Sequence, residues 1–460
     1  MKLIPIEKNK EYIVDIIDNG YDGEGIAKID EFTVFIPGAI KGEKIRVLIL
    51  KVLSSHAFGK ILEIISISPF RKELDCNTYK RCGGCNLRHI DYEETLNIKQ
   101  NIVKNLINKN LKTDVEVKQV WGMGNPYYYR NKLQFPIGVD KNGNTVMGVY
   151  ANRTHEIIPV ENCLIQDKES TKIAKSILDL IKEYNISAYN EETLSGIIRH
   201  IIIKKAFKTG EIMIIIVIND NNLPKLKEIS DSIFSNYPNV KSIIINSNMK
   251  KTNVILGDKN VKTIGESYIT DILGDFKFKI SSHSFYQVNP VQAEAMYYYA
   301  VEEANISKED IVFDLYCGIG TISLFLSKFA KKVYGVEIVK QAIEMANENA
   351  HLNSINNTKF IAGDTEIVLA DLINNKKVIP DIIVVDPPRK GLDNTTINNI
   401  LRIKPKKVIY ISCNPASLTR DLSKLEDMYS IKNIQPFDMF PFTSHVECVA
   451  VLELKKNIEK

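Results

Sequence analysis

A cysteine that directly follows a predicted strand is the residue of this chain whose setting best suits chemistry. Residues 406–421 read KKVIYISCNPASLTRD, in which β-branched and aromatic residues lead into a polar turn that carries Cys413. A lone cysteine usually packs as a small buried hydrophobe. Here, however, Ser412, Asn414 and Pro415 are turn-forming neighbours, and a thiol exposed at a strand end can ionise and attack. Cys413 is therefore our candidate nucleophile.

A second turn of the same kind lies shortly before it. Residues 382–391 read IIVVDPPRKG, so that four apolar residues of a buried strand lead to Asp386 and then to two prolines that cannot extend the strand. In an open α/β sheet, ligands bind beyond the carboxyl ends of the strands. We therefore expect Asp386 and Cys413 to face one crevice.

A glycine turn further upstream has the character of a cofactor site. Residues 311–330, IVFDLYCGIGTISLFLSKFA, predict a strand, a glycine turn and a helix. Glu337 ends the next predicted strand, where a carboxylate can accept hydrogen bonds from ribose hydroxyls. The turn lacks the third glycine of the dinucleotide fingerprint, which favours S-adenosyl-L-methionine (AdoMet) over NAD.

Three cysteines lie close together in the segment DCNTYKRCGGCNLRHI, namely Cys76, Cys82 and Cys85. A metal site built from these three thiolates would need a fourth ligand. Cys163 is the best candidate because the other three cysteines lie in the C-terminal part of the chain. Four thiolates suit a [4Fe-4S] cluster or a structural zinc ion, and the spacing does not decide between them. The spacing also differs from the C-x-x-x-C-x-x-C pattern of radical-AdoMet enzymes.

The bulk properties describe a multidomain globular protein. The chain has 460 residues, of which 44% are hydrophobic and 25% charged, and its formal net charge of +4 permits a nucleic-acid partner without requiring one. No apolar run approaches the length of a membrane span, and the first residues lack the apolar core of a signal peptide. We expect a cytoplasmic protein, in which seven cysteines indicate metal binding or catalysis rather than disulfides.

Three regions of α/β character follow from the patterns along the chain. Residues 1–66 predict five short strands of an OB-like β-barrel. Residues 67–271 predict an α+β domain that carries the cysteine cluster and, after it, an amphipathic helix over 91–110. Residues 272–460 alternate strands and helices, which predicts a doubly wound, Rossmann-like sheet.

The central region also contains basic and aromatic residues that suit single-stranded RNA. Such side chains stack on bases and contact phosphates, although the same composition fits an ordinary solvated sheet face. The candidates are Tyr127, Tyr128, Tyr129, Arg130, Lys132, Arg199, His200, Lys204 and Lys205.

Taken together, these motifs resemble the AdoMet-dependent RNA uracil-5-methyltransferases, and among them the bacterial 23S rRNA enzymes with an N-terminal TRAM domain. The resemblance covers nearly the whole chain. It rests on the barrel, the C-x5-C-x-x-C run with its distal cysteine, and the motifs FYQVNP, DLYCGIGT, DPPRKG, SCNPASLTRD and HVECV in that order. The resemblance implies that Cys76, Cys82, Cys85 and Cys163 hold a [4Fe-4S] cluster and that Gln287, Tyr316, Glu337 and Asp386 line the AdoMet site. It also implies that the helix from residue 91 packs on the catalytic domain.

The chemistry of such a reaction calls for the same groups. Because C5 of uracil is a poor nucleophile, a thiolate must first add to C6, and Cys413 suits that role. A carboxylate must then remove the C5 proton, and Glu447, in TSHVECVAVLEL, is our candidate base. His445 shares its face of the predicted strand, whereas Cys448 points the other way and is expected in the core. Gln287 and Asn289 are placed to hydrogen-bond cofactor or base, or to cap the helix that follows.

We therefore expect a 23S rRNA (uracil-5-)-methyltransferase, with an unstacked uridine of an RNA loop as its target and no protein partner implied. The nearest alternative is the same reaction on a T-loop uridine of tRNA, against which the barrel and the cysteine cluster count. A non-catalytic RNA-binding assembly factor and an iron-sulphur redox protein are further alternatives. The intact Cys413, Glu447 and Asp386 argue against the former, and the sequence supplies no electron partner for the latter.

Overall fold

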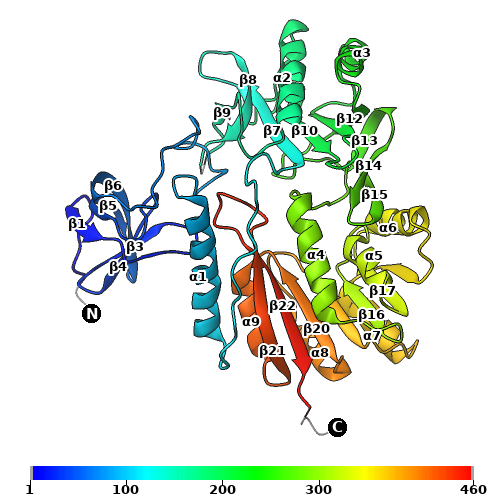
Figure 1. The fold of residues 1–460 in the computed structure, drawn as a ribbon. Coiled ribbons are helices and arrows are strands. Elements are labelled where there is room, and N and C mark those ends of the chain that lie inside the picture. The colour runs from blue at the N-terminus through cyan, green and yellow to red at the C-terminus, as the bar shows by residue number, and fades with distance from the viewer. Residues whose placement is uncertain (1–3, 153, 457–460) are drawn as a thin grey trace.

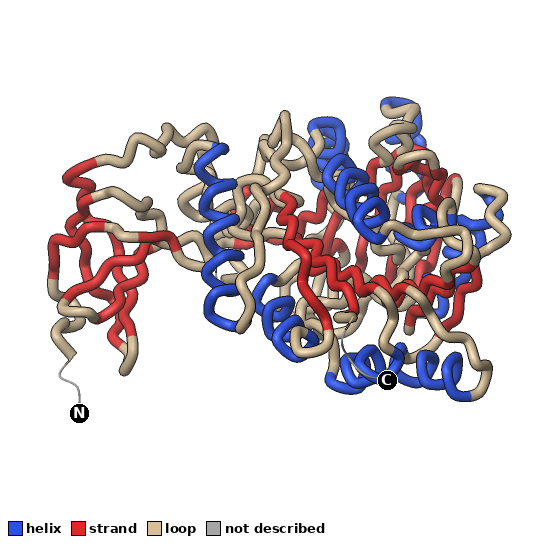
Figure 2. The backbone as a smooth tube through the Cα atoms, turned by 60° about the horizontal axis from the view of Figure 1, so that its bottom comes forward, coloured by secondary structure: helices blue, strands red, loops and turns tan. Residues whose placement is uncertain are grey.

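The N-terminal residues form a small β-barrel at one end of the molecule (Figures 1 and 2). The computed structural model describes residues 4–152 and 154–456. The barrel contains β1 (Glu11–Asp15), β2 (Asp18–Asn19), β3 (Gly25–Ile29), β4 (Phe32–Ile36), β5 (Lys44–Val52) and β6 (His56–Ser66), in the sheet order β1-β5-β6-β4-β3-β2. The first of the five expected strands is interrupted at residues 16–17, so six strands form. Alternate side chains of these strands enclose an apolar core.

A long helix, α1 (Tyr92–Asn110), stands between the barrel and the catalytic sheet (Figure 1). The side chain of Asp91 caps its N-terminus by accepting a hydrogen bond from the backbone of Glu93. Val103 and Ile107 on its apolar face are buried in the same core as residues of the C-terminal domain. The expected packing of this helix on the catalytic domain is confirmed.

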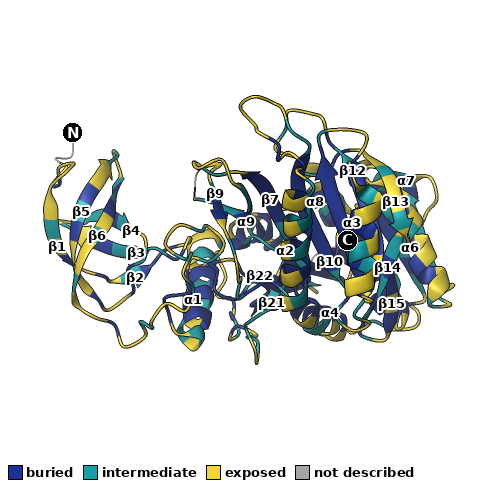
Figure 3. Ribbon diagram, turned by 90° about the horizontal axis from the view of Figure 1, so that it is seen from above, coloured by how far each residue is buried: buried dark blue, intermediate teal, exposed yellow. Residues whose placement is uncertain are grey.

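The central region is a seven-stranded sheet covered on one face by two helices. Its order is β13-β12-β11-β10-β7-β8-β9, with β11 and β12 parallel and the other pairs antiparallel. The strands are β7 (Lys132–Val139), β8 (Thr145–Tyr150), β9 (Ile157–Pro159), β10 (Ile198–Lys205), β11 (Ile212–Ile218), β12 (Val240–Ser247) and β13 (Lys259–Gly265). The helices are α2 (Lys168–Glu183) and α3 (Leu226–Asn236), and the strands beneath them are deeply buried (Figure 3).

The catalytic sheet has seven strands in the order β18-β17-β16-β19-β20-β22-β21, of which only β22 runs antiparallel to both of its neighbours. Its strands are β16 (Ile311–Leu315), β17 (Lys332–Glu337), β18 (Thr358–Ala362), β19 (Ile382–Val385), β20 (Lys407–Ser412), β21 (Tyr429–Phe437) and β22 (Glu447–Leu454). The helices are α4 (Pro290–Ala304), α5 (Thr321–Ser327), α6 (Lys340–Leu352), α7 (Thr365–Asn374), α8 (Asn394–Ile403) and α9 (Pro415–Leu425).

Helices cover both faces of this sheet. One face packs against α4 and α5, and the other packs against α1, α7, α8 and α9. The predicted doubly wound domain is therefore confirmed, and with it the α/β multidomain fold class.

The central and catalytic regions share one continuous core. The face of the central sheet that α2 and α3 do not cover includes Ile202 and Met213. These residues pack into the same apolar cluster as Tyr286 and Met296 of the catalytic region. A hairpin of β14 (Tyr268–Leu273) and β15 (Phe276–Ser281) joins the two regions and contains the boundary predicted between 271 and 272. Over the described residues, no helix has the length and apolar character needed to cross a bilayer.

Candidate active site and cysteine cluster

A cavity of about 720 Å³ opens beyond the carboxyl ends of the parallel strands of the catalytic sheet. Residues after β16, β17, β18, β19 and β20 line it, joined by residues before α4 and at the start of β22. It brings together all six residues predicted to act in catalysis or to bind cofactor, namely Gln287, Tyr316, Glu337, Asp386, Cys413 and Glu447. Segments that lie up to 160 residues apart in the sequence thus converge on one space.

Cys413 lies in a tight turn between β20 and α9. Ser412 Oγ accepts a hydrogen bond from the backbone of Asn414 (3.2 Å), and the Asn414 side chain then caps α9 by accepting one from the backbone of Ala416 (3.0 Å). These contacts fix the turn so that the thiol is partly exposed and faces the cavity. The prediction that Cys413 and Asp386 border one crevice is confirmed.

Two buried carboxyl groups share the cavity with this thiol. Burial raises the pKa of Asp386 to about 7. Burial, followed by the charge of Asp386, raises the pKa of Glu447 to about 8. Burial, then Glu447 and Asp386, raises the pKa of Cys413 to about 11, whereas the guanidinium of Arg389 lowers it. The thiol is therefore protonated at neutral pH in the unliganded protein.

The glycine turn after β16 leaves open space on the floor of the cavity. Tyr316, Gly318 and Gly320 all have positive φ angles, and a Cβ atom added at Gly318 would meet nothing within 4 Å. The Glu337 carboxylate accepts hydrogen bonds from the backbone of Gly318 (3.3 Å) and Val339 (3.0 Å). A ligand can therefore approach the backbone at Gly318 with Glu337 beside it.

The structure separates the two polar residues of the FYQVNP motif. Gln287 lines the cavity. Asn289 is fully buried, accepts a hydrogen bond from the backbone of Gln292 to cap α4, and donates one to the carbonyl of Met439 (3.1 Å). Asn289 thus has the capping role that we held open as an alternative.

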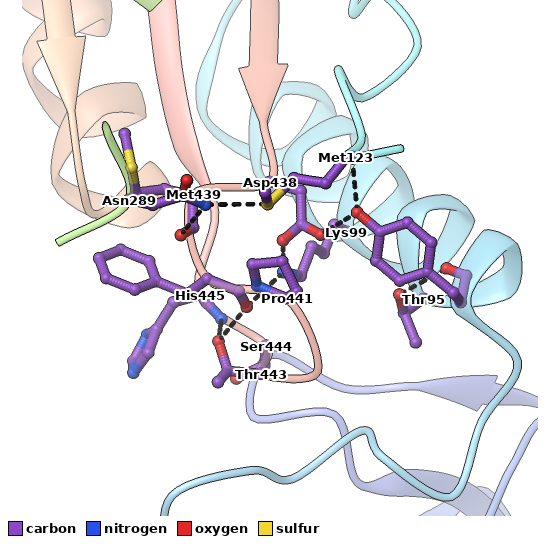
Figure 4. Close-up of polar contacts among 12 residues, drawn as sticks. Thr95, Lys99, Met123, Asn289, Asp438, Met439, Pro441, Thr443, Ser444 and His445 are labelled. Carbon is purple, nitrogen blue, oxygen red and sulfur yellow. Dashed lines mark hydrogen bonds and ion pairs between the residues drawn. The ribbon is translucent and has the colours of Figure 1, made fainter. Parts of the chain in front are cut away.

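The loop between β21 and β22, which leads to Glu447, is held by a buried ion pair (Figure 4). The ammonium group of Lys99 in α1 pairs with Asp438, and both side chains are fully buried. Asp438 also accepts a hydrogen bond from the Tyr92 hydroxyl (2.7 Å), while Lys99 donates to the carbonyl of Phe440 (3.1 Å). Helix α1 therefore fixes the loop that places the candidate base.

The barrel also reaches the active site. The Tyr21 hydroxyl, between β2 and β3, donates a hydrogen bond to Asn414 Oδ1 (2.9 Å), next to Cys413. Beside it, Asn86 Nδ2 donates both to the carbonyl of Asp22 and to Ser444 Oγ. The turn that carries Cys413 is thus held by residues from both ends of the chain.

The four predicted metal ligands gather in a second place. All four are half-buried, and the pKa of Cys85 is raised to about 12 by burial and then by Cys163, Cys82 and Cys76. Within the described residues, however, no group of three or more His, Cys, Asp or Glu side chains has an arrangement that could hold a metal ion. The metal site therefore stays a prediction.

The structure buries four of the nine residues that we predicted to face RNA. Tyr129, Arg199, His200 and Lys204 are buried, and Lys205 forms ion pairs with acidic groups. The four others, Tyr127, Tyr128, Arg130 and Lys132, are partly exposed, so the RNA face stays a prediction.

Some residues of the site were not assigned a role from the sequence. Arg389 and Asp364 line the cavity, and Arg389 is the cation that opposes the effect of the carboxylates on Cys413. Arg389 lies within the DPPRKG motif, so its place in the turn was visible. No sequence pattern pointed to Tyr21 or Asp438, because their contacts join segments more than 330 residues apart.

Comparison with known families decides the affiliation of this fold and site. A family model described as tRNA (uracil-5-)-methyltransferase matches residues 91–455, and a TRAM-domain model matches residues 5–62. The chain belongs to the tRNA (uracil-5-)-methyltransferase family. This confirms the family resemblance, including the TRAM identity of the barrel, but does not address the 23S rRNA subgroup.

Relatives within this family match over their full length. A protein of Clostridium acetobutylicum is 48% identical over 100% of both chains, and one of Halalkalibacterium halodurans is 46% identical over 98% of both. Both are described as uncharacterized RNA methyltransferases. Among solved structures, a Pyrococcus abyssi tRNA (uracil-54, C5)-methyltransferase in complex with S-adenosyl-L-homocysteine superposes with a TM-score of 0.76. It is 27% identical and covers 96% of this chain and 100% of its own.

We expect Lys99→Ala to lower the free energy of unfolding by about 3–5 kcal/mol, because it leaves the carboxylate of Asp438 buried without a partner. Urea denaturation followed by circular dichroism measures the change. Lys112→Ala, which breaks an exposed pair with Asp427 just beyond α1, is the matched control and should leave the midpoint unchanged. Equal midpoints for both variants would show that the buried pair does not hold the loop.

We expect Glu447→Gln to accelerate alkylation of Cys413 by iodoacetamide at pH 9, on the order of threefold or more. At that pH the Glu447 carboxyl is ionised and disfavours the thiolate, so removing its charge lowers the pKa of Cys413. Mass spectrometry of the Cys413 peptide gives the rate. The fully buried Cys448 should stay unmodified in both proteins, and an unchanged or slower rate at Cys413 would contradict the electrostatic coupling.

Proposed function

We propose that the protein transfers a methyl group from AdoMet to C5 of a uridine in RNA, giving 5-methyluridine. The observation that carries this proposal is the convergence of a partly exposed thiol, two buried carboxyl groups and an open glycine turn on one cavity. Family membership and the S-adenosyl-L-homocysteine complex of the Pyrococcus abyssi enzyme support the same cofactor.

The residues of the cavity divide into two groups under this proposal. Gln287, Tyr316, Glu337 and Asp386 would hold AdoMet, which supplies the methyl group as part of a sulfonium cation. Gly318 leaves room for such a ligand, and Glu337 offers acceptors for ribose hydroxyls. Cys413 and Glu447 would face the uracil ring, which must leave its stack to reach them.

Cys413 begins the proposed reaction when its thiol releases its proton to solvent and Sγ forms a bond to C6 of the uracil. The electrons of the C5–C6 double bond move into an enolate, and C5 becomes nucleophilic enough to take the methyl group from the sulfonium, which leaves as the neutral thioether S-adenosyl-L-homocysteine. The carboxylate of Glu447 then accepts the proton from C5, and the Sγ–C6 bond breaks to restore the double bond. Arg389 assists the first step because its charge favours the thiolate.

For the RNA, we propose 23S rRNA as the substrate. The resemblance to the rRNA enzymes and the cysteine cluster support this choice. The tRNA T-loop stays as a second candidate for a specific reason. The Pyrococcus abyssi enzyme acts on tRNA and matches 96% of this chain, so the barrel does not separate the two substrates.

Under this proposal, each of the three regions has a role of its own. Residues 1–66 would bind RNA, residues 67–271 would carry the cysteine cluster and face the RNA, and residues 272–460 would perform methyl transfer. The contact between Tyr21 and Asn414 supports a barrel that holds RNA next to the reactive thiol.

Covalent trapping tests the function and the substrate together. We expect the protein, with AdoMet, to form a stable adduct with 5-fluorouridine-substituted 23S rRNA, because fluorine at C5 cannot leave as a proton. A shifted band on a denaturing gel detects it, and substituted tRNA is run in parallel. Cys413→Ala should lose the adduct but keep AdoMet binding, whereas Cys448→Ala should keep both.

The outcomes of this experiment are distinct. An adduct with tRNA alone would select the second candidate, and an adduct that survives in Cys413→Ala would exclude Cys413 as the nucleophile. If wild-type protein that binds AdoMet trapped neither RNA, the methyltransferase proposal would fail in favour of non-catalytic RNA binding.

We further propose that Cys76, Cys82, Cys85 and Cys163 hold a [4Fe-4S] cluster, supported by their mutual proximity and half-buried setting. Protein purified without oxygen should be brown and contain about four iron atoms per chain. Replacing Cys85 by Ser should abolish the colour, whereas replacing the distant Cys448 should not. Colourless protein with one zinc ion per chain would instead establish a structural zinc site.

A further inference from the structure

A second large cavity, of about 940 Å³, lies on the central sheet and shares no lining residue with the catalytic cavity. It is formed by the β7–β8 hairpin, by β9, by residues 189–192 and by the start of β10. Strand β9 is the edge strand of this sheet, and Figures 1 and 3 place it on the side of the sheet nearest the barrel.

Planar side chains line this cavity at two places. The rings of Tyr150 and His155 lie 5.3 Å apart between centroids. The guanidinium of Arg199 lies over the ring of Tyr189, 4.5 Å from its centroid. Glu191 ties the first pair in place because it accepts a hydrogen bond from the Tyr150 hydroxyl and pairs with His155. Aromatic rings and arginine planes are the surfaces on which unpaired bases stack.

The cavity also has unpartnered polar groups among its buried lining residues. Arg199 and His200 are 5% and 6% exposed, and neither Arg199 Nε nor His200 Nδ1 has a hydrogen-bond partner among the described residues. The Nη1 group of Arg199 is fixed, since it donates to the carbonyls of Asn248 and Lys250. Burial, and then Arg199, lowers the pKa of His200 to about 4, so its ring is neutral and offers an acceptor nitrogen at neutral pH.

A base seated in this cavity would lie with a face against the planar side chains that line it.

The wall of the cavity continues into the cysteine segment. Arg81, which lines the cavity and immediately precedes Cys82, pairs with Glu156 (2.9 Å). Its carbonyl accepts a hydrogen bond from the backbone of Asn152, and Cys82 forms a β-bridge with Ala151. The cysteine segment thus supports the loop that carries the Tyr150 and His155 pair.

We propose that this cavity receives a second, unreacted base, extruded from the single-stranded RNA that carries the target uridine. This inference rests on the proposed function, because it requires an RNA substrate. It assigns to the central domain a site that reads the context of the target and is separate from the site that modifies it.

Affinity and turnover measured with Tyr150→Ala test the proposal. Tyr150 and His155 are not buried, so their removal leaves the core intact. Loss of one stacking surface should raise the Kd for whichever RNA is methylated by about tenfold, while kcat at saturating RNA stays within about twofold. His155→Ala should act in the same direction. Tyr298→Ala, at an exposed tyrosine of α4 outside both cavities, is the matched control and should bind as the wild type does.

Ultraviolet cross-linking gives a second readout that does not depend on activity. Wild-type protein is irradiated with total RNA from a bacterium, treated with nuclease and protease, and analysed by mass spectrometry. We expect nucleotide adducts on peptides that contain Tyr150, His155 or Tyr189. Adducts confined to the barrel and the catalytic cavity, with an unchanged Kd for Tyr150→Ala, would overturn the proposal and assign the cavity to a ligand other than RNA.

The failure of this inference is distinguishable from failure of the proposed function. If the wild type traps 5-fluorouridine RNA but Tyr150→Ala and Tyr298→Ala bind RNA with the same Kd, only the proposal of a second base site is overturned. If the wild type traps no RNA yet cross-links at Tyr150, the base site stands without the methyl transfer. If no RNA cross-links to any part of the protein, both the proposed function and the second base site are overturned.

Discussion

The position of the candidate base depends on the buried ion pair between Lys99 and Asp438. An ammonium and a carboxylate removed from water are costly unless each satisfies the other, so the pair strongly penalises any arrangement that separates them. Tyr92 and the carbonyl of Phe440 take up further hydrogen-bonding capacity of the two groups. The loop before β22 is thereby fixed to α1, and Glu447 enters the cavity at a defined place.

The same loop collects contacts from other regions of the chain. The backbone groups of Asn86 and Leu87, in the cysteine segment, donate to the carbonyl of Phe442, and Tyr129 donates to the carbonyl of Pro441. Phe442 is fully buried and has the guanidinium of Arg88 over its ring. The cysteine segment is thus hydrogen-bonded to the loop that leads to the candidate base, and also to the wall of the second cavity. A metal cluster there would stabilise both at once.

The electrostatics of the catalytic cavity follow from burial. Burial raises the pKa of Asp386, Glu447 and Cys413, and the charge of Asp386 raises it further for Glu447, as do both carboxylates for Cys413. A cationic cofactor is the natural complement of such a site, because it favours the carboxylates that would bind it and remove the C5 proton. Arg389 supplies part of this compensation before any ligand arrives.

The sequence alone determined the catalytic turns, the order of the elements and the family. Cys413, Asp386 and the glycine turn each follow a buried strand, and a parallel sheet necessarily brings such turns to one edge. Only the tertiary structure decided which polar residues are exposed and which distant segments meet. Arg199 and His200 looked like surface residues, yet the fold buries them in the wall of the second cavity, and nothing local marked Lys99 as the partner of Asp438. The physical reason is that periodicity and turn chemistry depend on neighbours along the chain, whereas burial and ion pairing depend on segments hundreds of residues apart.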